Sequence, residues 1–197
     1  MQYGFIKVAA GSPRLTVADV DANAASIREM IFRANAGGSN LLVLPELCLT
    51  GYTCGDLFYS ETLLNAAKNA LIELTESTKG LLSAVVIGLP LRVRGKLYNC
   101  AAVLQGGRIL GMIPKTYLPN YGEFYELRQF TPASDSTRSN QLFIGGQTVP
   151  FSEKLLFECA EKPEFTFSVE ICEDLWTPDP PSRRLCQAGA TVIANPS

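Results

Sequence analysis

The stretch "NLLVLPE" (residues 40–46) is a run of apolar residues that closes on a proline and a carboxylate. A continuous apolar run of this length predicts a strand buried on both faces, with the proline at its end. Before it, apolar residues recur at helical spacing over residues 17–36, and Gly37 and Gly38 end that helix. A helix followed by a fully buried strand is typical of α/β folds.

The same alternation continues along the chain. A second amphipathic helix is predicted over residues 60–79, and a short helix ends near Gly189. Gly106 and Gly107 lie between two apolar runs and predict a tight hairpin. A stretch rich in Pro, Gly, Ser and aromatic residues predicts a loop from about residue 117 to 146. The predicted strands are residues 4–10, 40–46, 83–90, 97–105, 108–115, 165–171 and 191–197.

Length and composition predict one globular domain over residues 1–197. Hydrophobic residues make up 47% of the chain and charged residues 18%, which indicates a buried core rather than disorder. The net charge of −2 gives no basic field that would attract nucleic acid or acidic lipid. No apolar run reaches the roughly 18 residues that span a bilayer, and the first residues lack the basic start of an export signal. We therefore expect a cytoplasmic protein that binds neither nucleic acid nor membrane.

Six cysteines and zero histidines restrict the possible chemistry. No two cysteines form a C-x-x-C pair, and a chain without an export signal is expected to keep its thiols reduced. Because zinc sites need paired cysteines or histidine, we expect no metal. Ser-His-Asp and Cys-His catalysis are excluded, since both use an imidazole as the base. Any catalytic base must therefore be a carboxylate, a lysine or a tyrosine.

Three reactive groups come at the ends of three predicted strands. Glu46 ends "LLVLPE", Lys115 ends "RILGMIPK" and Cys172 follows "FTFSVEI". In open α/β sheets, functional groups gather beyond the carboxyl ends of the strands. Although the three residues lie far apart in the sequence, these positions would let their side chains meet at one rim.

Cys172 stands among three carboxylates that lie within two residues of it: Glu170, Glu173 and Asp174. Nearby negative charge disfavours the thiolate, which is the form that attacks substrates. A lysine ammonium beside Cys172 would supply the positive charge that these neighbours deny it. A glutamate with a raised pKa would take the thiol proton as substrate approaches. The ammonium and the Glu173 backbone N–H would then stabilise an oxyanion.

Each of these residues also has a structural interpretation. A free cysteine is usually a buried packing residue, and Glu46 alone would be a cap after its strand. Because a carboxylate behind "LLVLP" is costly to bury without a partner, we favour a functional role for Glu46. Lys115 alone would be a solvated residue after an edge strand. The remaining cysteines are expected to pack in the interior: Cys48, Cys54, Cys100, Cys159 and Cys186.

Three segments carry a family resemblance: "LLVLPELCLTGY", "PKTYLPNYGEFYE" and "EICEDLW". In this order they resemble the catalytic segments of the nitrilase superfamily, the carbon–nitrogen hydrolases with a Glu-Lys-Cys triad. A single E, K or C carries no information, whereas three ordered segments with matching flanks are specific. The resemblance runs from the first strand to "ANPS". It implies a nitrilase-like α-β-β-α sandwich that pairs with another copy as a homo-oligomer.

The flanks narrow the resemblance to one branch of the superfamily. "KTYLPNYGEFYELRQF", "EICEDLW" and "GYTCGDLF" are similar to segments of glutamine-dependent NAD synthetases. In that branch this domain hydrolyses L-glutamine without a cofactor. The ammonia passes to a C-terminal domain that uses ATP and Mg to amidate nicotinic acid adenine dinucleotide to NAD. Since the last predicted strand stops at Ser197, we expect an N-terminal piece of a longer protein, truncated within the sandwich, with the synthetase domain outside these residues.

The resemblance also implies residue roles. Glu46 would be the general base, Lys115 the oxyanion stabiliser and Cys172 the nucleophile that forms a glutamyl thioester. Glu126 is implied as a second carboxylate that positions the lysine, with Glu123 as the rival because the matching glutamate lies nearer the lysine in other branches. For both glutamates a solvated loop face is the alternative, as a core position is for the aromatic residues. The residues implied around the substrate are Tyr52, Tyr121, Phe124, Glu173 and Ser197.

Two other functions remain open from the sequence. The first is a free-standing amidase or carbamoylase that uses the same triad on another small amide. The second is a non-catalytic assembly module, in which the fold supplies a dimer surface. A strong preference for glutamine over other amides would favour the glutaminase over the first alternative. Selective reactivity of Cys172 among the six cysteines would exclude the second.

Overall fold

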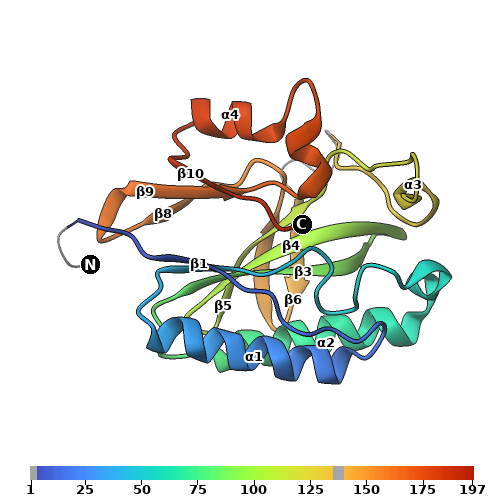
Figure 1. The fold of residues 1–197 in the computed structure, drawn as a ribbon, viewed down its shortest axis with the longest axis horizontal. Helices are drawn as coiled ribbons and strands as arrows, with labels where there is room; N and C mark the ends of the chain where they lie inside the picture. Colours follow the sequence, from blue (N-terminus) through green and yellow to red (C-terminus); the bar gives the residue numbers. More distant parts are fainter. Residues whose placement is uncertain (1–3, 135–139) are drawn as a thin grey trace.

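The computed structural model describes residues 4–134 and 140–197, which form two stacked β-sheets with helices on their outer faces (Figure 1). Within these residues the larger sheet has seven strands in the order β1-β2-β3-β4-β5-β7-β6, and the smaller has three in the order β10-β9-β8. Helices lie below the larger sheet and above the smaller one in this view. The predicted α/β fold and its α-β-β-α layering are confirmed.

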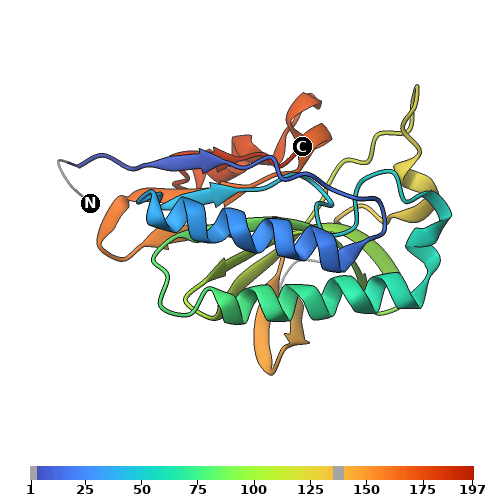
Figure 2. The same ribbon diagram turned by 60° about the horizontal axis from the view of Figure 1, so that its bottom comes forward.

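Two long helices cover the outer face of the larger sheet. Helix α1 (Val20–Ala36) and helix α2 (Glu61–Ser77) lie side by side (Figure 2). The side chain of Asp19 caps α1 by accepting the Ala22 N–H. The buried apolar residues of both helices pack against the sheet in one core. A shorter helix, α4 (Pro181–Gln187), lies over the smaller sheet.

The larger sheet combines parallel and antiparallel pairs. Its first three strands in chain order are parallel, the next two form antiparallel hairpins, and β5 pairs parallel with β7. The strands are β1 (Val8–Ala10), β2 (Leu41–Val43), β3 (Ala84–Val93), β4 (Lys96–Gln105), β5 (Arg108–Pro114), β6 (Asn140–Ile144) and β7 (Gln147–Phe151).

The smaller sheet supplies the second wall of the sandwich. Its strands are β8 (Phe157–Cys159), β9 (Lys162–Val169) and β10 (Val192–Ala194). Strand β9 pairs antiparallel with β8 and parallel with β10. Aromatic residues of this sheet stack in the space between the sheets, where the rings of Phe157 and Phe167 lie 5.1 Å apart.

Side-chain alternation along β4 determines where the site lies. Cys100 and Ala102 belong to the core under the helices, whereas Ala101 and Val103 belong to the core between the sheets. Successive side chains of a strand point to opposite faces, so Asn99 belongs to the side between the sheets. On the side of β4 that faces the smaller sheet, the apolar side chains are therefore followed by one buried polar side chain, that of Asn99.

The structure corrects several predicted boundaries. Residues 117–146 were predicted as a loop, but they contain the short helix α3 (Glu126–Gln129) and strand β6, while residues 135–139 lie outside the described residues. Gly145 and Gly146 form the β6–β7 turn with positive φ angles. The strand predicted over 40–46 ends at Val43, because Pro45 has no N–H to extend the ladder. Strand β8 and the 3₁₀ helix η1 (Gly55–Tyr59) were not predicted.

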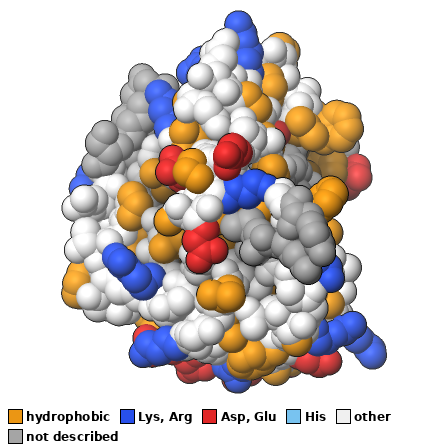
Figure 3. Space-filling model, turned by 90° about the vertical axis from the view of Figure 1, so that its left-hand side faces the viewer, with side chains coloured by type: hydrophobic (Ala, Val, Ile, Leu, Met, Phe, Trp, Pro, Cys, Tyr) orange, Lys and Arg blue, Asp and Glu red, His pale blue; other side chains and the backbone are white. Residues whose placement is uncertain are grey.

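The face drawn in Figure 3 shows no dominant charge over its described part. Basic, acidic and hydrophobic side chains are interspersed on the described part of the face drawn in Figure 3. Among the described helices, none combines the length and the apolar character needed to cross a membrane.

Candidate active site

The loop after β2 carries Glu46 back into the protein. Leu44 extends the strand pairing by donating its N–H to Val86, and Leu47 then takes a positive φ of 50°. The loop lies directly on β3 at Gly88, where an added Cβ would come within 2.3 Å of the Leu47 nitrogen. Because Gly88 has no side chain, the Glu46 loop can pack against the strand, and the Glu46 carboxylate is buried.

Lys115 follows β5 and is among the most deeply buried side chains, with 1% of its surface exposed. Its backbone N–H donates to Asn99 of β4 at 2.8 Å, which continues the β4–β5 pairing by one residue. Its ammonium lies 2.6 Å from Glu46 Oε1 and 2.7 Å from Glu126 Oε1. A buried ammonium is stable only with such partners.

The segment after Lys115 places its two predicted glutamates differently. Glu126 begins α3, is buried, and accepts hydrogen bonds from Lys115 and from the Tyr52 hydroxyl at 2.8 Å. Glu123 is exposed, although it lines the same pocket as Tyr52 and Glu126. Of the two candidates for the second carboxylate, the geometry brings Glu126 to the lysine.

Asn99 is a member of this cluster that the sequence analysis missed. Its side-chain N–H group lies 2.6 Å from Glu46 Oε1 and 3.4 Å from Glu126 Oε2. The available signal was a single amide inside the apolar strand "LYNCAAVLQ", because a polar residue buried in a strand needs partners. The sequence did not indicate which partners these would be.

Cys172 lies at the end of the smaller sheet, where the β9–β10 pairing continues beyond both strands. Its N–H donates to Pro196 at 3.0 Å, and the 3₁₀ helix η3 (Cys172–Trp176) begins with it. Cys172 has a φ of 44°, an uncommon left-handed conformation for a residue with a side chain. Strained backbone of this kind clusters at functional sites.

The Cys172 thiol lies near enough to Glu46 and Lys115 for both charges to act on its pKa, and Glu46 acts more strongly. Burial, and next the Glu46 carboxylate, raise the pKa of this thiol, whereas Lys115 and a hydrogen bond with Ser197 lower it by less. The positive charge expected from Lys115 is therefore outweighed, because two carboxylates already surround the ammonium. The surroundings of Cys172 therefore disfavour the thiolate at rest.

Glu46 and Lys115 shift each other's protonation. Burial raises the pKa of the Glu46 carboxyl above its usual value, Lys115 opposes this, and Glu126 adds to it. Burial alone would lower the pKa of Lys115, but the two glutamates outweigh it and raise that pKa. The site therefore holds a charged lysine beside a carboxylate that binds protons more readily than an ordinary glutamate.

The acidic neighbours of Cys172 are engaged elsewhere. Asp174 accepts backbone N–H groups from Thr116, Tyr117 and Ile171 at 2.7–3.0 Å. Glu170 is buried and accepts the Ser182 N–H. The negative charge that most affects the thiol comes from Glu46, which is remote in the sequence. The carboxylates adjacent in the sequence are therefore not the main source of negative charge at the thiol.

Three aromatic residues lie between the Glu46–Lys115–Glu126 cluster and the protein surface. Phe124 packs edge-to-face against Tyr52 at 6.3 Å and against Tyr121 at 5.8 Å. Tyr121 is exposed and donates its hydroxyl to the Glu173 carboxylate at 2.9 Å. Of the residues predicted around the substrate, these four form a continuous wall from Glu126 outward. The fifth, Ser197, is exposed, and a hydrogen bond with it lowers the pKa of the Cys172 thiol.

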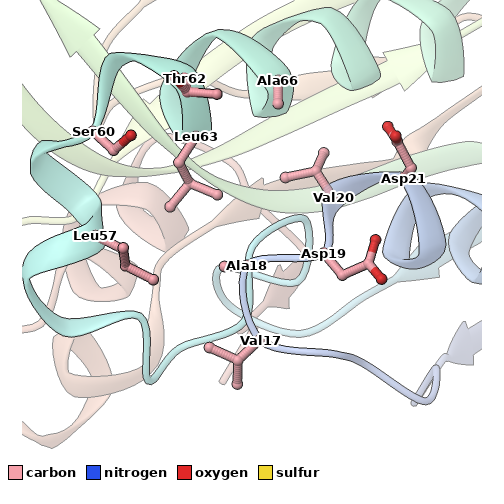
Figure 4. Close-up of a pocket in the computed structure, with 10 residues that line it drawn as sticks. All are labelled: Val17, Ala18, Asp19, Val20, Asp21, Leu57, Ser60, Thr62, Leu63 and Ala66. Atoms are coloured by element: carbon pink, nitrogen blue, oxygen red, sulfur yellow. The ribbon is translucent and has the colours of Figure 1, made fainter.

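Two further features lie away from this cluster. Between the start of α1 and the η1–α2 segment there is a pocket of about 450 Å³ (Figure 4), lined by none of the predicted site residues. Its Asp19 carboxylate serves as the cap of α1. Among the described residues, no group of three or more His, Cys, Asp or Glu side chains is placed to hold a metal ion.

A cysteine beside a buried Glu-Lys-Glu cluster, at one end of an α-β-β-α sandwich, is an arrangement suited to nucleophilic attack without an imidazole. Residues 7–197 match the carbon–nitrogen hydrolase family, and the chain belongs to this family.

Two glutamine-dependent NAD(+) synthetases are similar to this chain over most of its length. The chain is 45% identical over 194 residues to the glutamine-dependent NAD(+) synthetase of Mycobacterium tuberculosis, covering 98% of this chain and 28% of that protein. A crystal structure of a glutamine-dependent NAD(+) synthetase from Cytophaga hutchinsonii superposes with a TM-score of 0.83 at 30% identity, covering 98% of this chain and 30% of that one. The chain therefore spans less than a third of the length of these synthetases.

A solved amidase from Nesterenkonia sp. has the same fold. It superposes with a TM-score of 0.70 at 21% identity and covers 97% of this chain and 64% of the amidase. This similarity supports the nitrilase-like sandwich.

Proposed function

We propose that this chain hydrolyses the side-chain amide of L-glutamine to glutamate and ammonia. The observation that supports it most directly is the buried Lys115–Glu46 ion pair of 2.6 Å near the half-buried Cys172 thiol, in a chain of the carbon–nitrogen hydrolase family. Glutamine as the substrate is supported by the 45% identity to a glutamine-dependent NAD(+) synthetase. The exposed Tyr121–Glu173 pair offers a carboxylate for the amino group of an amino acid.

The first half of the reaction forms a thioester. The Cys172 sulfur attacks the amide carbon while Glu46 takes the thiol proton, and the carbonyl electrons move onto the oxygen. Lys115 carries three N–H protons, two of which bind Glu46 and Glu126, so the third is available to the oxyanion. The Glu173 N–H, in the first turn of η3, lacks an intrahelical acceptor and is a second donor. Collapse of the intermediate breaks the C–N bond, and the leaving nitrogen takes the proton from Glu46 as ammonia.

The second half hydrolyses the thioester. A water molecule gives its proton to Glu46 and attacks the acyl carbon, again with the oxyanion beside Lys115. Collapse breaks the C–S bond, glutamate leaves, and the sulfur recovers the proton from Glu46. The raised pKa of Glu46 suits this alternation, because a base works best when its pKa lies near the working pH.

We further propose that the ammonia serves the ATP-dependent amidation of nicotinic acid adenine dinucleotide in a synthetase domain, as the family resemblance implies. The matched relatives are glutamine-dependent NAD(+) synthetases. The chain would then be the glutaminase part of a glutamine-dependent NAD synthetase, with ATP and Mg bound in the other domain. Pairing of copies into a homo-oligomer remains a prediction of the family resemblance.

Ammonia release from several amides tests the proposal. We expect glutamine to be hydrolysed far faster than asparagine or propionamide. In Cys172→Ala, hydrolysis should fall by a factor on the order of 10⁶, while circular dichroism shows an intact fold. Similar rates for all three amides would instead support an amidase of broad specificity. Wild-type rates in Cys172→Ala would rule out the thioester.

A further inference from the structure

Asn99 links the two carboxylates that surround Lys115. Its side-chain N–H group bridges Glu46 Oε1 at 2.6 Å and Glu126 Oε2 at 3.4 Å. The Lys115 ammonium bridges the same two glutamates at 2.6 and 2.7 Å. One neutral amide and one ammonium therefore close a ring of hydrogen bonds around two buried carboxylates.

We propose that Asn99 is a positioning residue that keeps Glu46 ionised and turned with its second oxygen toward the Cys172 thiol. This inference rests on the proposed function, because it concerns the base of that reaction. It adds a residue that neither touches substrate nor exchanges protons.

The orientation of Glu46 follows from which oxygen is bound. Among the described residues, the two side-chain donors Asn99 and Lys115 both bind Oε1. With Oε1 held by these two donors, Oε2 is the oxygen that takes the Cys172 proton in this proposal, and after burial the Glu46 charge is what most raises the pKa of that thiol. The backbone carbonyl of Asn99 also accepts the Lys115 N–H at 2.8 Å, so one residue of β4 fixes both the glutamate and the lysine.

The second role of Asn99 in this proposal is to favour the ionised form of Glu46. Two glutamates and one lysine leave one net negative charge in a buried place, which favours protonation of a glutamate. Charged or titratable groups face Glu46 from every element packed on it, namely Lys115 after β5, Glu126 of α3, Cys172 of η3 and Tyr52 before η1. Burial raises the pKa of Glu46 most, and the Asn99 hydrogen bond lowers it.

A purely structural role does not account for Asn99. Its side chain is buried with 1% exposed, and its Oδ1 atom has no hydrogen-bond partner within the described residues. Burying an unpaired carbonyl costs stability that a leucine at the same place would avoid. The hydrogen bonds that its side chain does make are those to Glu46 and Glu126.

The test measures the Glu46 titration directly. Protein labelled with ¹³C at glutamate carboxyl carbons is titrated by NMR, with Glu46→Gln to assign the signal. In Asn99→Leu the Glu46 midpoint should rise by about one pH unit, as expected for the loss of one hydrogen bond to a charged group. Thr78→Val is the matched control, since it removes a buried hydroxyl that binds the Gly107 N–H at the other end of β4. It should leave the midpoint unchanged.

The pH profile of ammonia release gives a second readout. In Asn99→Leu the acidic limb should move up by the same amount, with the rate recovering at high pH, which a general loss of structure would not produce. If Asn99→Leu does not fold, the isosteric Asn99→Asp replaces the donor by an acceptor, and its Glu46 midpoint should rise further. An unchanged midpoint in the folded variant overturns the inference. A shifted midpoint in a protein that does not hydrolyse glutamine would instead contradict the proposed function alone.

Discussion

The Cys172 thiol is surrounded by groups that disfavour its ionisation at rest. It is half-buried and lies near the Glu46 carboxylate, and burial and this negative charge both raise its pKa. Lys115 lies nearby, but its charge is shared by Glu46 and Glu126. In the proposed reaction, proton transfer to Glu46 would therefore accompany attack on the substrate.

Replacing Glu46 by glutamine should separate thiol acidity from catalysis. Glu46→Gln removes the negative charge, so the pKa of Cys172 should fall and its alkylation by iodoacetamide at neutral pH should become faster. Amide hydrolysis should nevertheless be lost, because no base remains. Peptide mass spectrometry across a pH series would follow Cys172 alone, and an unchanged or slower alkylation would contradict this account.

At the scale of elements, three loops reach one point because backbone contacts hold them there. The loop after β2 lies on Gly88 of β3, and the residue after β5 pairs with β4. Asp174 of η3 joins the other two loops, since it binds the amides of Thr116 and Tyr117 as well as that of Ile171. A carboxylate that accepts three N–H groups fixes the lysine segment against the nucleophile segment.

Asp174 should give a characteristic pH dependence of stability. Burial raises its pKa to about 7, against three backbone hydrogen bonds that lower it. Since the folded state holds this proton more tightly than the unfolded state, the contribution is fully present below about pH 4 and lost as pH rises through 7. Asp174→Asn does not titrate, so its deficit in the free energy of unfolding should shrink from pH 4.5 to pH 8.

Urea unfolding at several pH values checks this prediction. Asp179→Asn is the control, because hydrogen bonds from Arg184, and then Arg183, lower the pKa of Asp179. Its contribution is present at neutral pH and lost in acid, so its deficit should change in the opposite direction. A deficit of Asp174→Asn that grows with pH would show that the folded protein prefers the ionised carboxylate.

The elements differ in how far the sequence predicts them. Helical periodicity and Gly106–Gly107 placed α1, α2 and the β4–β5 hairpin. The β6–β7 hairpin was missed although Gly145 and Gly146 give the same signal, because the preceding residues are rich in turn formers. Asn99 was missed for another reason. Its role depends on two glutamates brought to it by tertiary structure, which local pattern cannot reveal.

At the scale of the whole molecule, the site lies where the layer between the two sheets meets the loops at one end. Glu46 and Lys115 come from the larger sheet, and Cys172 comes from the smaller one. Strand-end positions predicted this meeting, whereas the sharing of the lysine by two carboxylates required the folded chain. The roles of these residues in the reaction remain predictions.

The central claim is that Cys172 alone is made reactive toward a glutamine-like substrate. Burial raises the pKa of Cys48 to about 12, whereas Cys186 is exposed to any electrophile. The direct measurement is peptide mass spectrometry after incubation with a glutamine analogue that carries an electrophile on its side chain. We expect one adduct, on Cys172, whose formation glutamine suppresses. Adducts spread over Cys186 and other cysteines, or labelling of Cys172 that glutamine does not suppress, would contradict the account.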